Sequence, residues 1–93
     1  MSSSDKILEK YFQEIKKEYI KSKDRFPPFA NLDHAFGTLS LKLDDLKDEL
    51  KKHNYDYQKV EHELIQIANI ALRSLTENIE PYYQDLKFEQ KQK

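Results

Sequence analysis

The chain has 93 residues, no cysteine, and a formal net charge of −1 from 16 basic and 17 acidic side chains. A chain this short forms one small domain with a thin core, and its near-neutral charge gives no field that would gather nucleic acid or anionic lipid. The lack of cysteine excludes disulfides, thiolate zinc sites and a cysteine nucleophile, so oxygen atoms would have to hold most of any metal ion.

An all-α fold is predicted, because the chain has one glycine and three prolines and its apolar residues recur every three or four positions. The first helix is expected over residues 5–23. The segment KDRFPPFANLD then ends it, since a proline biases the residue before it away from helical angles. The apolar stripe of this helix consists of Leu8, Tyr11, Phe12, Ile15 and Tyr19.

The second helix is expected over residues 32–52, and its apolar residues form a seam suited to packing on another helix. A third, central helix is expected over residues 57–80, with Asp56 as a good N-cap and Pro81 as its end. Residues 81–93 would form a tail with one short helical turn. The chain is therefore predicted to be a single domain, 1–93, forming a three-helix bundle that dimerisation completes. The seam of the second helix consists of Leu32, Phe36, Leu39, Leu43, Leu46 and Leu50.

Four acids, Asp44, Asp45, Asp48 and Glu49, lie between the members of that leucine seam. With the seam turned inward these acids point largely outward, so a solvated helix face explains them as well as a metal site does. Glu63 falls just outside the wide apolar stripe of the third helix, where a half-buried carboxylate needs a partner or an ion. The residues alone leave both interpretations open.

Two segments carry a resemblance to a known family. The loop Phe26-Pro27-Pro28-Phe29 and the helical segment ELIQIANIALR, residues 63–73, resemble the MazG-like nucleotide pyrophosphohydrolases, particularly their short phage-borne versions. In those proteins a loop similar to FPPFNS-x-HEGYA leads into EE-x-x-E-L, and a later helix reads EELIQVAAMALR. The resemblance covers roughly residues 25–80.

What the resemblance implies is an all-α dimer or tetramer in which acids from two adjacent helices hold Mg²⁺. The family cuts a nucleoside triphosphate to a monophosphate and pyrophosphate, and Mg²⁺ suits that reaction because it neutralises phosphate charge and activates water. Asp45 and Glu63 match family ligands, and Asp48 and Glu49 are neighbouring substitutes. The family's two adjacent glutamates correspond here to Leu41 and Lys42, so the metal motif is degenerate.

The same resemblance suggests that Gln66 and Asn69 contact the base or ribose of a substrate, and Phe29 is a further candidate for substrate binding because an aromatic ring can stack on a nucleobase. Gln66 and Asn69 lie on the polar side of the third helix, where solvent exposure is the default. Phe29 would stack on a base, although an aromatic residue at such a position more often fills a core. No residue is assigned a catalytic role.

Three functions follow as hypotheses. The first is a MazG-like helical protein with a degenerate metal site, non-catalytic, acting through protein binding in a phage or prophage context. The second is a Mg²⁺-dependent pyrophosphohydrolase that converts dNTP to dNMP and pyrophosphate, and the third is a small helical inhibitor or interaction module of host or defence proteins. We expect a cytoplasmic homodimer or tetramer, with a host or phage protein or a nucleotide as partner, no membrane association and no nucleic acid.

Overall fold

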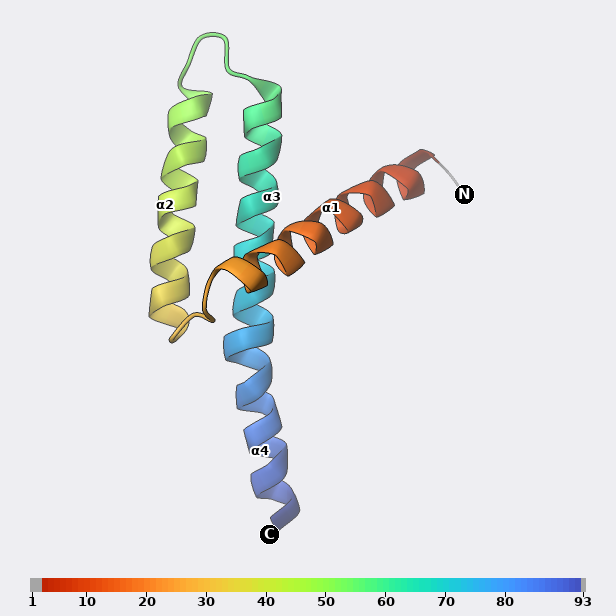
Figure 1. Cartoon of the computed structure of the whole chain (residues 1–93), viewed down its shortest axis with the longest axis vertical. Coiled ribbons are helices and arrows are strands. Elements are labelled where there is room, and N and C mark those ends of the chain that lie inside the picture. The colour runs from red at the N-terminus through yellow and green to blue at the C-terminus, as the bar shows by residue number, and fades with distance from the viewer. Residues whose placement is uncertain (1–2, 93) are drawn as a thin grey trace.

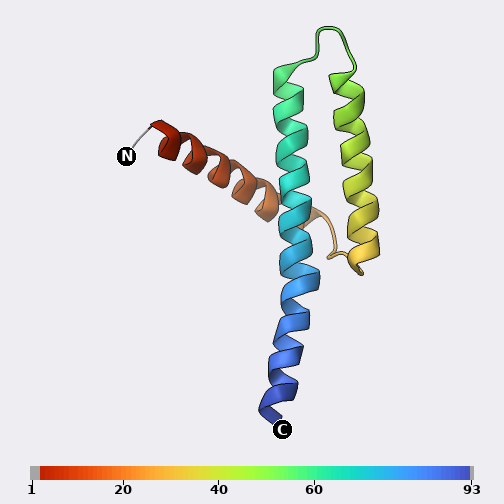
Figure 2. The same cartoon turned by 180° about the vertical axis from the view of Figure 1, so that it is seen from behind.

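A computed structural model describes residues 3–92, with side chains placed for residues 3–86. The chain forms α1 (Ser3–Arg25), α2 (Leu32–Leu50), α3 (Tyr57–Ser74), a π-helical turn η1 (Leu75–Ile79) and α4 (Glu80–Gln92). The predicted all-α class is confirmed. Helices α2 and α3 lie side by side as an antiparallel hairpin, α1 crosses α3 and projects away from it, and α4 prolongs α3 (Figures 1 and 2).

Both caps of the hairpin follow from local sequence. The Asn31 side chain accepts a hydrogen bond from the His34 N–H at 2.8 Å and so starts α2. The Asp56 side chain accepts one from the Gln58 N–H at 2.8 Å and starts α3. These bonds satisfy N–H groups that have no partner within the first turn of a helix.

The predicted C-terminal helical tail is present as α4, but Pro81 does not end the helical path, and this corrects the predicted end of the third helix. In a regular α-helix the proline ring would clash with the carbonyl of Glu77, and proline has no N–H to donate. The π turn immediately before it widens the helix, and the Glu80 N–H bonds to the Leu75 carbonyl, five residues back. Such single π turns are a known way to accommodate a local mismatch inside a helix. Lys93 and residues 1–2 of the predicted domain lie outside the described residues.

The intramolecular core is small. Among the described residues the buried apolar side chains are Phe29, Ala35 and Ile70, with Leu39 packed against them. The radius of gyration is 16.6 Å, whereas a compact domain of this length has about 12 Å. The leucine-rich seam of α2 is therefore only partly covered, with Leu43 and Leu50 remaining exposed.

Among residues 3–92 the structure has no helix of the length and apolarity that a membrane crossing requires.

Candidate functional site

A polar groove runs along one side of the α2/α3 hairpin. The residues that line it follow one another at steps of three or four on both helices, which places them on one face of each. The groove holds two cavities end to end. We call the one near the loop that joins α2 to α3 the acid pocket, and the one near the Phe26–Phe29 loop the amide pocket. Their lining residues are Asp45, Asp48, Glu49, Lys52, Lys59, His62 and Glu63 for the acid pocket, and Glu18, Ser22, Phe26, Pro27, Phe29, His34, Thr38, Lys42, Gln66, Asn69, Ile70 and Arg73 for the amide pocket.

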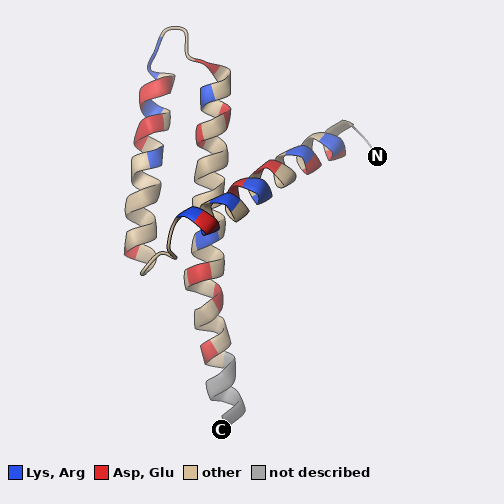
Figure 3. Cartoon of the chain, in the orientation of Figure 1, with Lys and Arg blue, Asp and Glu red and all other residues tan. Residues whose placement is uncertain are grey.

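All four residues expected to hold a metal ion line the acid pocket, which has a volume of about 310 Å³. Asp45, Asp48 and Glu49 come from α2 and Glu63 comes from α3, so the antiparallel pairing of the two helices brings them together. Acidic and basic residues alternate along this end of the hairpin (Figure 3). Within residues 3–92, however, no group of three or more His, Cys, Asp or Glu side chains is arranged to hold a metal ion.

Glu49 is the buried member of this group, at 7% exposure. One of its carboxylate oxygens lies 2.7 Å from the Lys52 ammonium, and the other accepts a hydrogen bond from the Asp56 N–H at 3.2 Å. The bond to Lys52 is the largest influence that lowers the pKa of Glu49, and the Asp56 N–H adds to it. The same contact raises the pKa of Lys52. Glu49 therefore ties the end of α2 to the start of α3.

Of the other three carboxylates of the acid pocket, Asp45 and Asp48 are exposed and Glu63 is half-buried. Asp45 is exposed and lies 4.0 Å from the Lys42 ammonium on the preceding turn. Glu63 is half-buried, and its Oε2 atom is shielded from solvent without a hydrogen-bond partner. A buried carboxylate oxygen in this state attracts a donor or a cation.

The amide pocket has a volume of about 360 Å³ and is lined by all three residues expected to contact a substrate. Asn69 is 2% exposed, so the expectation that it would lie in solvent is wrong. Its amide nitrogen donates to the Ser22 hydroxyl at 3.1 Å, and that hydroxyl donates to the Tyr19 carbonyl. The Asn69 Oδ1 atom is buried without a partner, so a ligand that brings a hydrogen-bond donor into this pocket would satisfy it.

Arg73 forms the floor of the amide pocket but does not offer it a free charge. Its guanidinium makes a bidentate contact with Glu77, donates to the Pro27 carbonyl at 2.8 Å and lies 4.5 Å from the centre of the Phe29 ring. Arg73 and Glu77 are both almost fully buried. The pair therefore holds the Phe26–Phe29 loop against α3 and is electrically neutral as a unit.

Further polar side chains that line the amide pocket are Glu18, His34, Lys42 and Gln66. Gln66 donates to the Glu18 carboxylate at 2.6 Å, and Lys42 lies on the α2 side. His34 accepts a hydrogen bond from the Ala30 N–H through Nδ1. The pocket thus has acceptors on the α1 and α3 side and the Lys42 ammonium on the α2 side, which suits a ligand with donor groups at one end and negative charge at the other.

Sequence reasoning did not assign roles to Ser22, Arg73 or Glu77. The spacing of Arg73 and Glu77, four residues apart on a helix, is the signal that would have suggested an ion pair. Ser22 gave no signal, because its contact with Asn69 joins residues 47 positions apart.

Comparison of the chain with protein-family models, with curated proteins and with solved structures found no match.

Proposed function

We propose that this chain is a MazG-like helical protein that assembles with itself and works by binding another macromolecule, without hydrolysing nucleotides. The expected partner is a host or phage protein. The proposal has two parts, self-association and a degenerate metal site, and each has its own support.

The observation that carries the proposal is the excess of exposed surface. The chain exposes 7563 Å², whereas a compact monomer of its mass, 11.2 kDa, exposes about 5,700 Å². The difference, about 1,900 Å², is similar to one subunit's share of an obligate homodimer interface, about 1,000–2,500 Å². Much of this surface is apolar and includes Leu8, Phe12, Leu43, Leu64 and Leu75.

Lysines in the acid pocket support the second part. Lys52 binds one oxygen of Glu49 and Lys42 lies beside Asp45, so two of the four expected ligands already have a cation. Mg²⁺ requires near-octahedral oxygen coordination, and the pocket as arranged does not fit it without displacement of these lysines. Lys42 stands where the resemblance places a family glutamate.

A direct assay tests the absence of hydrolysis. The purified protein is incubated with each dNTP and Mg²⁺, and pyrophosphate release is measured; we expect no release above the buffer rate. Sustained release that Glu63→Gln abolishes, and that the exposed control Asp44→Asn leaves intact, would overturn the proposal. Light scattering over a range of protein concentrations tests self-association, and we expect a mass above that of the monomer. A monomer mass at every concentration would contradict self-association.

A Mg²⁺-dependent nucleoside triphosphate pyrophosphohydrolase is the second candidate, and the unpartnered Oε2 atom of Glu63 favours it. The acid pocket then supplies the carboxylates for the metal, and the amide pocket receives the nucleotide. Calorimetric titration with Mg²⁺ or Mn²⁺, with and without a non-hydrolysable nucleotide, separates the two candidates. Saturable binding that Glu63→Gln removes supports the enzyme, and no binding at saturating metal excludes it.

A further inference from the structure

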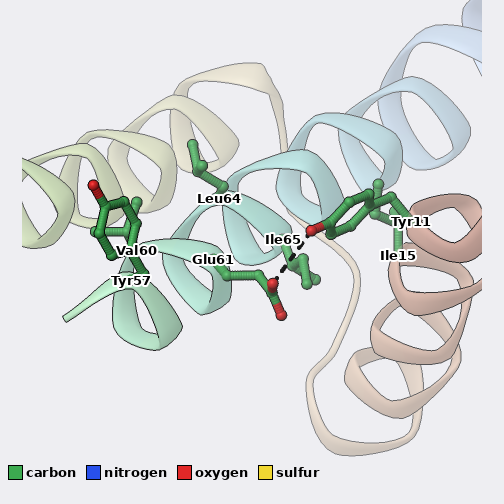
Figure 4. Close-up of a pocket in the computed structure, with 7 residues that line it drawn as sticks. All are labelled: Tyr11, Ile15, Tyr57, Val60, Glu61, Leu64 and Ile65. Atoms are coloured by element: carbon green, nitrogen blue, oxygen red, sulfur yellow. Dashed lines mark hydrogen bonds between the residues drawn. The ribbon is translucent and has the colours of Figure 1, made fainter. Parts of the chain in front are cut away.

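A groove lies on the opposite side of α3, in the angle between α3 and the projecting helix α1. It has a volume of about 460 Å³, and its walls are mostly apolar. Figure 4 shows Tyr11 and Ile15 of α1 across from the side chains of α3, with the Tyr11 hydroxyl bonded to the Glu61 carboxylate at 3.3 Å. We call this cavity the wedge groove. Its α3 side consists of Tyr57, Val60, Glu61, Leu64 and Ile65.

The apolar lining of the wedge groove continues along α1 towards its N-terminal end. Ile7 and Leu8 lie one turn N-terminal to Tyr11, Phe12 directly follows it, and each of these three side chains is more than half exposed. Residues 7, 8, 11, 12 and 15 fall within one face of α1. The chain therefore has an exposed apolar groove and, next to it, an exposed apolar segment. We call this segment, Ile7, Leu8 and Phe12 in the N-terminal half of α1, the arm.

We infer that the wedge groove of each subunit receives the N-terminal half of α1 from a second copy of this chain. This rests on the self-association proposed above and names the surfaces that make it. In a two-fold dimer the same surface of each subunit forms the contact. The arm of each subunit would therefore lie in the groove of the other, and one contact would cover both grooves and both arms. A foreign helix, or α4 of a second copy, would fill the groove but leave the arm exposed.

The size of the uncovered surface also favours a second copy as the occupant. An excess of about 1,900 Å² requires a cover that is present whenever the chain is folded, since three buried apolar residues make a weak core on their own. A second copy is available at equal concentration from synthesis onwards.

Single-cysteine variants test the pairing, because the natural chain contains no cysteine. Leu8→Cys protein carrying an affinity tag is mixed with untagged Leu64→Cys protein, and the chains are joined with a short bismaleimide. Each chain then has one thiol, so any tagged–untagged product is a contact between two copies. Tyr57→Cys, at the other end of the groove, replaces Leu64→Cys if the latter does not fold.

We expect the Leu8→Cys and Leu64→Cys mixture to give at least about tenfold more cross-linked product than a control that uses Gln13→Cys, because docking raises the local thiol concentration to the millimolar range. Gln13 is exposed and lies on a different face of α1. Cross-linking confined to Leu43→Cys would place the second copy on the hairpin and overturn the inference, as would cross-linking confined to Tyr83→Cys. A dimer mass with no arm-to-groove product overturns this inference alone, whereas a monomer mass overturns it together with the proposed self-association.

Discussion

Helix α3 has a mostly polar face and a mostly apolar face, and on each face some side chains have the opposite burial from the one their type indicates. Asn69 and Arg73, on the face that lines the polar groove, are almost fully buried, whereas Leu64, on the other face, is more than half exposed. The polar face is covered by the chain's own loop and by α1, through hydrogen bonds to Pro27 and Ser22. The apolar face has no comparable cover among the described residues, and we propose that a second copy of the chain covers it.

The largest expected effect is on the polar face. Arg73→Ala leaves the buried Glu77 carboxylate without its partner, which costs about 3–5 kcal/mol, and it also removes the donor to the Pro27 carbonyl. Urea unfolding measures this loss. The double variant Arg73→Met with Glu77→Leu removes both charges, so its free energy of unfolding should fall much less. An equal fall in the single and the double variant would show that the ion pair does not contribute to stability.

On the apolar face, Leu64→Asp is expected to weaken self-association by about 1.5–3 kcal/mol, which is the free energy gained by burying one leucine side chain. That corresponds to an increase in the dissociation constant of about tenfold to a hundredfold, measured by analytical ultracentrifugation. Leu41→Asp is the control, since Leu41 is also exposed, at 67% against 51% for Leu64, but lines neither the polar groove nor the wedge groove. Equal weakening by both substitutions would contradict the assignment of the apolar face as the interface.

Asn69→Leu tests whether the Asn69 amide contributes to the stability of the fold or is available to bind a ligand. The substitution removes an unpartnered buried oxygen together with one hydrogen bond to Ser22, so the free energy of unfolding should change by no more than about 1 kcal/mol. Chemical denaturation measures the change. A loss as large as that of Arg73→Ala would mean that Asn69 is a main support of the polar face.

The smallest effect concerns pH. Because the pKa of Glu49 is lowered in the folded protein by Lys52, its contribution to stability is present above the pKa of the unfolded chain and is lost as the pH falls through the folded value. Glu49→Gln should therefore lower the melting temperature near neutral pH and leave it unchanged in acid. Asp44→Asn serves as the control, and parallel melting curves for wild type and Glu49→Gln at every pH would refute the assignment.

Some of this arrangement could be predicted from local residues. The start of α3 at Asp56 and the end of α1 before the two prolines follow from the chemistry of single residues and their neighbours. Asp45 and Glu63, which the resemblance matches to family ligands, both line the acid pocket. Pro81 shows the limit of such rules, because a π turn formed by the preceding residues lets the helix continue.

The lysine partners of the acids and the burial of Asn69 were harder to predict. Lys52 and Glu49 are three residues apart, a spacing that indicates a pair but does not say that its carboxylate is buried. Ser22 and Asn69 meet only because α1 crosses α3, and no periodicity within either segment contains that crossing. The proposed metal and substrate roles of these residues stay predictions.

The sequence by itself determined the helical class and the separation of polar from apolar residues around each helix, because these depend on spacing within one helix. The tertiary structure decided which face of α3 is covered and which carboxylates are paired. Those outcomes depend on the crossing of α1 over α3 and on contacts between residues far apart in the chain, for which local spacing carries no information.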